Sequence, residues 1–328
     1  MKTFSEYRNA LKGLSIKESA DSQYTLFPED KKELWEMIKD EIKVQGPEAD
    51  LNHIDVSKIT DFSNLFKCSA FNGDISKWDV SNAENMAGMF ASSKFNGDIS
   101  DWDVSNVTDM SGMFQWAMSF NQSLDGWDVS NVTNMSDMFC GAANFNGDIS
   151  TWDVRNVKNM SGMFYSCVFN GNLKRWNTKN VTNMNKMISM AKSFNQDISS
   201  WNVSKVKDMS GMFNGCTLFN QDISKWNVSK VKKMNEMFNG CGSFNQDLSD
   251  WNVSNVEYMN SMFYKCISFN QDLSWWDTSK VKDMSHMFDG AESFNQDLSG
   301  WDVSNVYDMS KMFNNCPCPE EYQPKFSE

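Results

Sequence analysis

Histidine and proline are scarce in this chain. Its 328 residues include only 2 His and 5 Pro. His53 and His286 alone cannot supply a His-rich metal site or a histidine-based catalytic relay. No apolar run approaches the ~20 residues that cross a bilayer, so the sequence predicts no membrane span. No apolar segment follows the first residues, which predicts no signal peptide and a cytoplasmic location.

Acidic and large apolar residues are abundant instead. The chain carries 43 Asp and Glu against 30 Lys and Arg, a formal net charge of −13. This balance argues against a general nucleic-acid partner, because such proteins neutralise phosphates with basic residues. The 24 Met, 24 Phe and 13 Trp exclude a largely disordered chain, which would be poor in aromatic residues.

Tryptophan marks an internal repeat that covers most of the chain. Ten of the 13 tryptophans recur every 24 or 25 residues, and a segment around Ile54 fits the same frame. Eleven units therefore fill residues 51–316, and such a period is typical of stacked repeats. The repeated tryptophans are Trp78, Trp102, Trp127, Trp152, Trp176, Trp201, Trp226, Trp251, Trp276 and Trp301.

The apolar spacing within residues 194–216 predicts the content of one unit. Four residues step by 3, 2 and 3, the rhythm of a leucine-rich repeat with a short strand: Ile198, Trp201, Val203 and Val206. Four more fall on one face of a short helix: Met209, Met212, Phe213 and Cys216. The sequence thus predicts an α/β solenoid of the leucine-rich-repeat type, with one short parallel strand and one short helix in each of about eleven coils.

Both ends of the repeat need a cover. Residues 28–44 read as a helix because apolar residues recur every four positions and Gly46 and Pro47 stop it. We therefore expect residues 1–50 to form an N-terminal helical cap, with a second helix within residues 1–25. Residues 317–328 form a polar tail.

The tryptophan column is predicted to face the core. The residue after each Trp is Asp or Asn, and burying a row of carboxylates would cost several kcal/mol for each ion. Tryptophan is therefore inside and Asp or Asn outside. Carboxylates stacked from Asp79 to Asp153 could alternatively hold calcium; no other cofactor is expected.

Five cysteines share one place in the repeat, three residues after the helix Phe. They are Cys167, Cys216, Cys241, Cys266 and Cys316, and other units place Ala or Ser there. A site that accepts Cys, Ala or Ser favours a small buried residue and a reduced thiol. Cys316 and Cys318 flank one proline and are the pair that could be oxidised.

The outer face supplies the candidate partner-binding residues. The residue before each Trp varies most along the repeat, which is typical of a recognition surface: Lys77, Asp101, Thr151, Arg175, Lys225, Asp250 and Trp275. Residues 71–153 carry a net charge of −10, whereas residues 174–233 carry +8. Within the basic stretch, four lysines are expected to stack and steer an acidic partner: Lys205, Lys207, Lys230 and Lys232.

The unit FNxDISxWDVSNVTxMSxMF resembles the BspA-like leucine-rich-repeat surface proteins, in the mycoplasma-lipoprotein branch with this tryptophan. The resemblance covers residues 51–316. It implies an adhesin or binding scaffold at a bacterial cell surface, without enzymatic activity.

The leading functional hypothesis is a non-catalytic repeat scaffold that binds a protein, or mediates adhesion, through its outer strand face and loop edges. No nucleophile and base recur together, so an enzyme is not expected. A carbohydrate-binding module is one alternative, resting on aromatic residues outside the core frame: Trp116, Tyr165, Tyr264 and Trp275. A structural subunit of a phage, virion or cell-surface assembly is another, and the sequence leaves the oligomeric state open.

Overall fold

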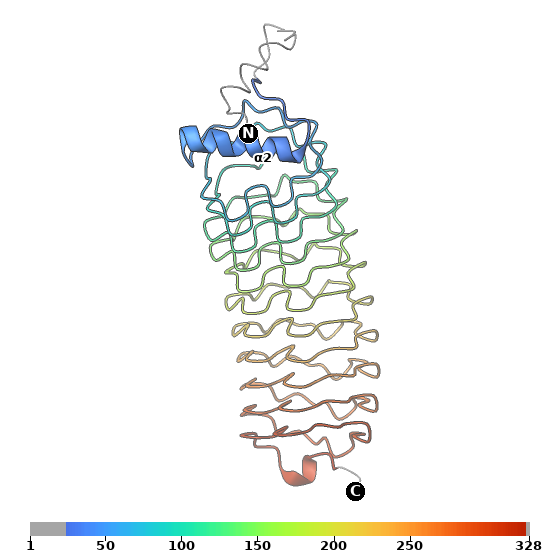
Figure 1. The fold of residues 1–328 in the computed structure, drawn as a ribbon. Helices are drawn as coiled ribbons and strands as arrows, with labels where there is room; N and C mark the ends of the chain where they lie inside the picture. Colours follow the sequence, from blue (N-terminus) through green and yellow to red (C-terminus); the bar gives the residue numbers. More distant parts are fainter. Residues whose placement is uncertain (1–23, 326–328) are drawn as a thin grey trace.

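The computed structural model describes residues 24–325, which form a tall stack of coils (Figure 1). Helix α2, Lys31–Gln45, crosses the N-terminal end, and the short 3-10 helix η1, Glu320–Tyr322, lies at the other end. One parallel bridge per coil links each coil to the next, and we number the coils 1 to 11 by these residues: Asp61, Asn85, Asp109, Asn134, Asn159, Asn183, Asp208, Lys233, Tyr258, Asp283 and Asp308. Each coil from 2 to 11 starts at a Phe–Asn pair, such as Phe194 and Asn195 in coil 7.

The predicted strand and helix in each coil are wrong. Within residues 24–325 the backbone has no strand longer than an isolated bridge, and its only helices are α2 and η1. The chain is therefore not an α/β solenoid with a strand and a helix per coil. Tight turns take the place of both elements.

The segment that read as a helix is a run of turns. In coil 7 the N–H of Met212 bonds to the carbonyl of Met209, and the N–H of Asn214 to that of Gly211, each three residues back. Every second N–H, including those of Met209 and Phe213, instead bonds to a carbonyl of coil 8. A helix would keep all these donors within the segment. Consecutive tight turns bury the same i, i+3, i+4 and i+7 positions as a helix does. The apolar spacing therefore predicted a helix where the chain forms turns.

The predicted strand is broken by polar corners. The pattern Asp or Asn, apolar residue, Ser occurs up to three times per coil, and the side-chain oxygen accepts the backbone N–H two residues on. In coil 11 these bonds measure 2.8–2.9 Å and run from Ser299 to Asp297, Ser304 to Asp302 and Ser310 to Asp308. Such Asx turns bend the backbone at each corner. Each is followed by an i→i−3 bond, for example from the Val306 N–H to the Val303 carbonyl, so few donors remain for a sheet.

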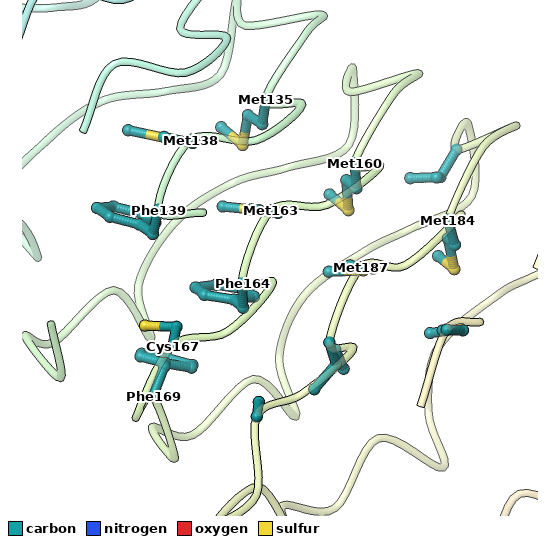
Figure 2. Packing of buried hydrophobic residues seen from close by; sticks show 14 of the residues in the cluster. Met135, Met138, Phe139, Met160, Met163, Phe164, Cys167, Phe169, Met184 and Met187 are labelled. Atoms are coloured by element: carbon teal, nitrogen blue, oxygen red, sulfur yellow. The ribbon is translucent and has the colours of Figure 1, made fainter. Parts of the chain in front are cut away.

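The inward side chains form continuous columns. All ten repeat tryptophans are 2–5 % exposed, and Trp176 stacks on Trp201 with ring centroids 6.3 Å apart. Each indole Nε1 also donates to a carbonyl of the preceding coil, as from Trp201 to Leu173 at 3.0 Å. Figure 2 shows the methionine and phenylalanine columns, with equivalent residues of successive coils in parallel rows. The core thus grows by adding identical layers, as in other repeat proteins.

An asparagine ladder joins the coils at the Phe–Asn pair. The Oδ1 of each Asn accepts the backbone N–H of the equivalent Asn in the next coil, as from Asn220 to Asn195 at 3.0 Å. Nine such bonds, from Asn96 to Asn295, run through the stack. Where Gln follows the Asn, its Nε2 often joins the same oxygen, as from Gln221 at 2.9 Å. The asparagine is therefore structural.

The N-terminal cap closes the first coil. Helix α2 starts at the N-cap Asp30, whose side chain accepts the Glu33 N–H, and ends at Gly46 with φ +89°. It buries Leu34 and Ile38 against the core. The helix predicted for residues 28–44 thus spans Lys31–Gln45. The second helix predicted within residues 1–25 lies almost wholly outside the described residues.

Two left-handed positions recur in every coil, two and six residues after the first residue of the turn run, which is Phe62 in coil 1 and a Met in the others. A large side chain at such a position leans over a glycine in the next coil. Trp116 covers Gly141 and Met190 covers Gly215, and both glycines have positive φ. Glycine is needed there because it accepts left-handed backbone and leaves room for the covering side chain.

Replacing Gly141 with alanine is expected to lower the free energy of unfolding by about 1–3 kcal/mol. Its φ is +67°, and an added Cβ would lie 2.2 Å from the Trp116 ring. Gly300 is the matched control, since its Cβ would meet nothing within 4 Å. Urea unfolding followed by circular dichroism compares the two; equal losses for Gly141→Ala and Gly300→Ala would contradict this account.

Candidate functional site

The varied residues before each Trp are all on the surface. Lys77, Asp101, Thr151, Arg175, Lys225, Asp250 and Trp275 are exposed. Two of them pair in adjacent coils, because the Lys225 Nζ lies 3.1 Å from the Asp250 Oδ2. Trp275 is 84 % exposed, the most of any large apolar residue described. This column therefore offers one free aromatic anchor beside a partly neutralised charge pair.

A shallow hollow lies beside Trp275. It measures about 390 Å³ and is lined by residues of coils 10 and 11: Asp272, Ser274, Gln296, Asp297, Ser299 and Gly300. Asp272 and Asp297 already accept the N–H groups of Ser274 and Ser299. The hollow thus presents hydroxyl, amide and carboxylate groups and is open to solvent, and the exposed Trp275 directly follows Ser274 of its lining.

Four lysines form what we call the lysine edge: Lys205, Lys207, Lys230 and Lys232. The Lys232 N–H bonds to the Lys207 carbonyl at 2.9 Å, which places these residues in adjacent coils one above the other. Lys205 donates to the Asn180 Oδ1 at 2.6 Å, and Lys232 lies 3.5 Å from Glu257. Lys207 and Lys230 have no side-chain partner among residues 24–325. Two exposed amines therefore remain free to meet an acidic group.

Apart from Trp116, sequence reasoning missed a second surface, which we call the apolar turn edge. It lies in the turn that ends each coil and contains Trp116, Met118, Val168, Met190, Leu218 and Ile267, each 40–54 % exposed. The sequence had predicted a helix in the segment before these turns. That prediction gave no indication that the residues after it would line up along one edge of the stack. The aromatic residues Tyr165 and Tyr264 are only half-exposed.

The aspartate column proposed for calcium is occupied by turn hydrogen bonds. Asp79, Asp103 and Asp128 each accept the N–H of the Ser two residues on, at 3.0–3.1 Å. Asp153 instead accepts from Arg155 and forms an ion pair with it at 2.7 Å. Within residues 24–325, no three His, Cys, Asp or Glu side chains are grouped so that they could hold a metal.

At another corner of the coil, hydrogen bonds lower the pKa of three aspartates, Asp98, Asp197 and Asp222. The Lys174 amine and then the Ser199 hydroxyl and N–H lower the pKa of Asp197 to about 2. The N–H and hydroxyl of Ser100 likewise lower the pKa of Asp98, and those of Ser224 lower the pKa of Asp222. Turn hydrogen bonds thus favour the ionised form of Asp98 and Asp222, and Lys174 together with Ser199 does so for Asp197, which is a structural role.

The cysteines are free thiols. None of the eight is in a disulfide, and this includes Cys316 and Cys318. Burial raises the pKa of Cys167 to about 11 and that of Cys216 further still. The Cys216 thiol donates to the Ile188 carbonyl at 3.0 Å. Such protonated, buried thiols are poor nucleophiles and poor metal ligands.

The helices described between residues 24 and 325 include none that is both long and apolar enough to cross a membrane. No curated protein matches the sequence. One family model, described as "Mycoplasma protein of unknown function, DUF285", matches residues 32–150, 135–248 and 219–323. Its three overlapping matches cover the whole repeat at residues 51–316, whereas they do not establish the narrower BspA-like leucine-rich-repeat identity. The chain belongs to this mycoplasma repeat family of unknown function.

Proposed function

We propose that this protein is a non-catalytic repeat scaffold that binds an acidic protein partner through the lysine edge. The supporting observation is that Lys207 and Lys230 lie in adjacent coils and are exposed, and that their side-chain amines have no acidic or hydrogen-bonding partner within residues 24–325. Surrounding residues 174–233 carry a net charge of +8 in a chain of −13. A basic region of this kind steers an acidic partner toward one side of the molecule.

The rigid core supports the same proposal. Inward columns and corner bonds repeat from coil to coil, while the exposed positions change. Loops and outward residues on a fixed scaffold are where binding proteins place their specificity. A BspA-like kinship, an adhesive role and a cell-surface location are finer proposals that the repeat unit favours.

Affinity capture from the native cell tests the lysine edge. Reversal of two charges in the Lys207→Glu, Lys230→Glu variant is expected to reduce capture of the partner by roughly tenfold. Capture by the unaltered chain should also weaken as salt rises, because exposed charges are screened. The captured protein is identified by mass spectrometry, and its binding is then measured with purified components.

Lys67→Glu combined with Lys311→Glu is the matched control, since both lysines are exposed and the net charge change is the same. If both variants capture equally less of the partner, the loss is due to the overall charge of the chain and not to the lysine edge. Carbohydrate is the second candidate, favoured by the exposed Trp275 beside its hollow. If Trp275→Ala removes the captured material, the lysine variant does not, and that material is a glycan, the carbohydrate proposal replaces the protein one.

A further inference from the structure

Exposed apolar residues of the coils concentrate on one edge. Residues 51–316 contain eight exposed large apolar side chains, and six of them belong to the apolar turn edge. The turns that form this edge provide only three or four residues of each coil, for example residues 190–193 in coil 6. An exposed row of this kind marks an interaction site. Trp275 and Tyr307, the other two, lie elsewhere on the coil.

Backbone hydrogen bonds hold these turns in a fixed register. The N–H of Trp116 bonds to the Cys140 carbonyl of the next coil at 2.7 Å, and that of Met190 to Asn214 at 2.6 Å. Equivalent bonds link the intervening turns, so the edge is a rigid column rather than a set of loose loops. Coils joined in this way are ~4.8 Å apart, and the column from coil 3 to coil 9 is therefore ~29 Å long.

The order of apolar residues along this column is symmetric. Trp116 and Met118 lie in coil 3, Val168 in coil 5, Met190 in coil 6, Leu218 in coil 7 and Ile267 in coil 9. Coils 4 and 8 present small residues there, such as Ala143 and Gly242. If a second, reversed copy of the column is aligned at coil 6, coil 3 lies opposite coil 9, coil 4 opposite coil 8 and coil 5 opposite coil 7. Apolar residues then face apolar residues, and small residues face small residues. A surface that matches its own reverse fits a second copy related by a twofold axis.

Charges on the edge obey the same symmetry. The turns of coils 2 to 10 carry only four charged residues: Lys94, Lys192, Lys265 and Glu292. Reversal brings Lys94 of coil 2 opposite Glu292 of coil 10, and Lys265 of coil 9 opposite Trp116 of coil 3. The first is an ion pair and the second a cation–π contact. Lys192 would approach its own copy near the axis, where its long stem lets the amine reach solvent.

We propose that two copies of this chain pair antiparallel along the apolar turn edge, with a twofold axis at Met190. In this dimer Trp116 and Met118 pack against Ile267 of the other copy, and Val168 packs against Leu218. The edge is poor in acidic residues, so it is a face through which two chains of charge −13 can approach. The lysine edge lies on another side of the coil and stays exposed.

Sedimentation equilibrium on the full chain tests the pairing. We expect the unaltered chain to form a dimer, and Met190→Lys to raise its dissociation constant by at least about tenfold, because two further amines then meet at the axis beside the Lys192 pair. Tyr307→Lys makes a similar change at a residue 69 % exposed but off the edge, and it should leave the dimer intact. Circular dichroism of both variants verifies that the fold is kept.

A charge exchange distinguishes this dimer from other contacts. Lys94→Glu alone should weaken dimerisation, and the double variant Lys94→Glu, Glu292→Lys should restore it. The two residues are eight coils, ~38 Å, apart within one chain, so only an antiparallel partner couples them. An unaltered chain that stays monomeric at several hundred micromolar overturns the proposal. So does a folded double variant that fails to regain the dimer.

Discussion

Replacing Trp276 with alanine is expected to lower the free energy of unfolding by about 3–5 kcal/mol. The indole is 3 % exposed, stacks on Trp301 with centroids 6.2 Å apart, and packs beside Phe263 in the preceding coil. Its Nε1 donates to the Leu248 carbonyl at 3.0 Å. Truncation removes both the hydrogen bond and the packing, and it leaves a cavity between three layers that cannot close without moving the coils.

The adjacent Trp275 provides the matched control. It belongs to the same coil but is 84 % exposed, so Trp275→Ala should change the free energy of unfolding by no more than about 0.5 kcal/mol. Urea unfolding monitored by far-ultraviolet circular dichroism measures both without relying on tryptophan fluorescence. If the two substitutions cost the same, the inward orientation of the repeat tryptophan does not stabilise the stack as described.

Acid is expected to unfold the stack between about pH 4 and pH 2. The hydroxyl and N–H of Ser279 lower the pKa of Asp277, those of Ser105 lower the pKa of Asp103, and Asp302 is lowered in the same way by Ser304. An aspartate in an unfolded chain has a pKa near ~3.9. Because the folded values are lower, the stabilisation is present above that pH and is lost as the pH falls through the folded values, to about 2 for Asp197. Melting temperatures measured from pH 7 to pH 2 follow this loss.

Asparagine separates the turn bonds from general acid effects. In the same column, Asn202 already accepts the Ser204 N–H at 3.1 Å. The triple variant Asp103→Asn, Asp277→Asn, Asp302→Asn keeps an acceptor that does not titrate, so its acid midpoint should move to lower pH. A control replaces exposed carboxylates that accept no turn hydrogen bond, through Asp101→Asn, Glu84→Gln and Glu292→Gln. An equal shift in both variants would assign acid unfolding to charge repulsion rather than to the corners.

Much of the molecule follows from the period of the sequence. The ten tryptophans 24 or 25 residues apart establish a stack of similar units, and the Asp or Asn after each Trp indicates which side faces inward. The N-terminal helix is equally local, because apolar residues four apart between Pro28 and Gly46 leave one compatible element. These features depend on spacing and on the cost of burying charge, and both can be read from a single chain.

The backbone conformation within each coil was decided only by the hydrogen bonds between coils. Met209, Met212, Phe213 and Cys216 have helical spacing, yet alternate N–H groups of this segment bond to the next coil instead of to the segment itself. The spacing of inward residues cannot distinguish a helix from consecutive tight turns, since both bury the same positions. The Asp-x-Ser pattern was a local signal for turns. It indicates a turn because the aspartate side chain accepts the backbone N–H of the residue two positions later, as the structure shows.

The two candidate surfaces show the same division. The sequence alone determined that lysines recur in the basic stretch and that an extra tryptophan stands at position 275. Only the tertiary structure decided that Lys207 and Lys230 stay unpaired while Lys232 meets Glu257. It also gathered Met118, Val168 and Leu218 on one edge, because stacking at one fixed register turns residues 25 or 50 positions apart into neighbours along a column.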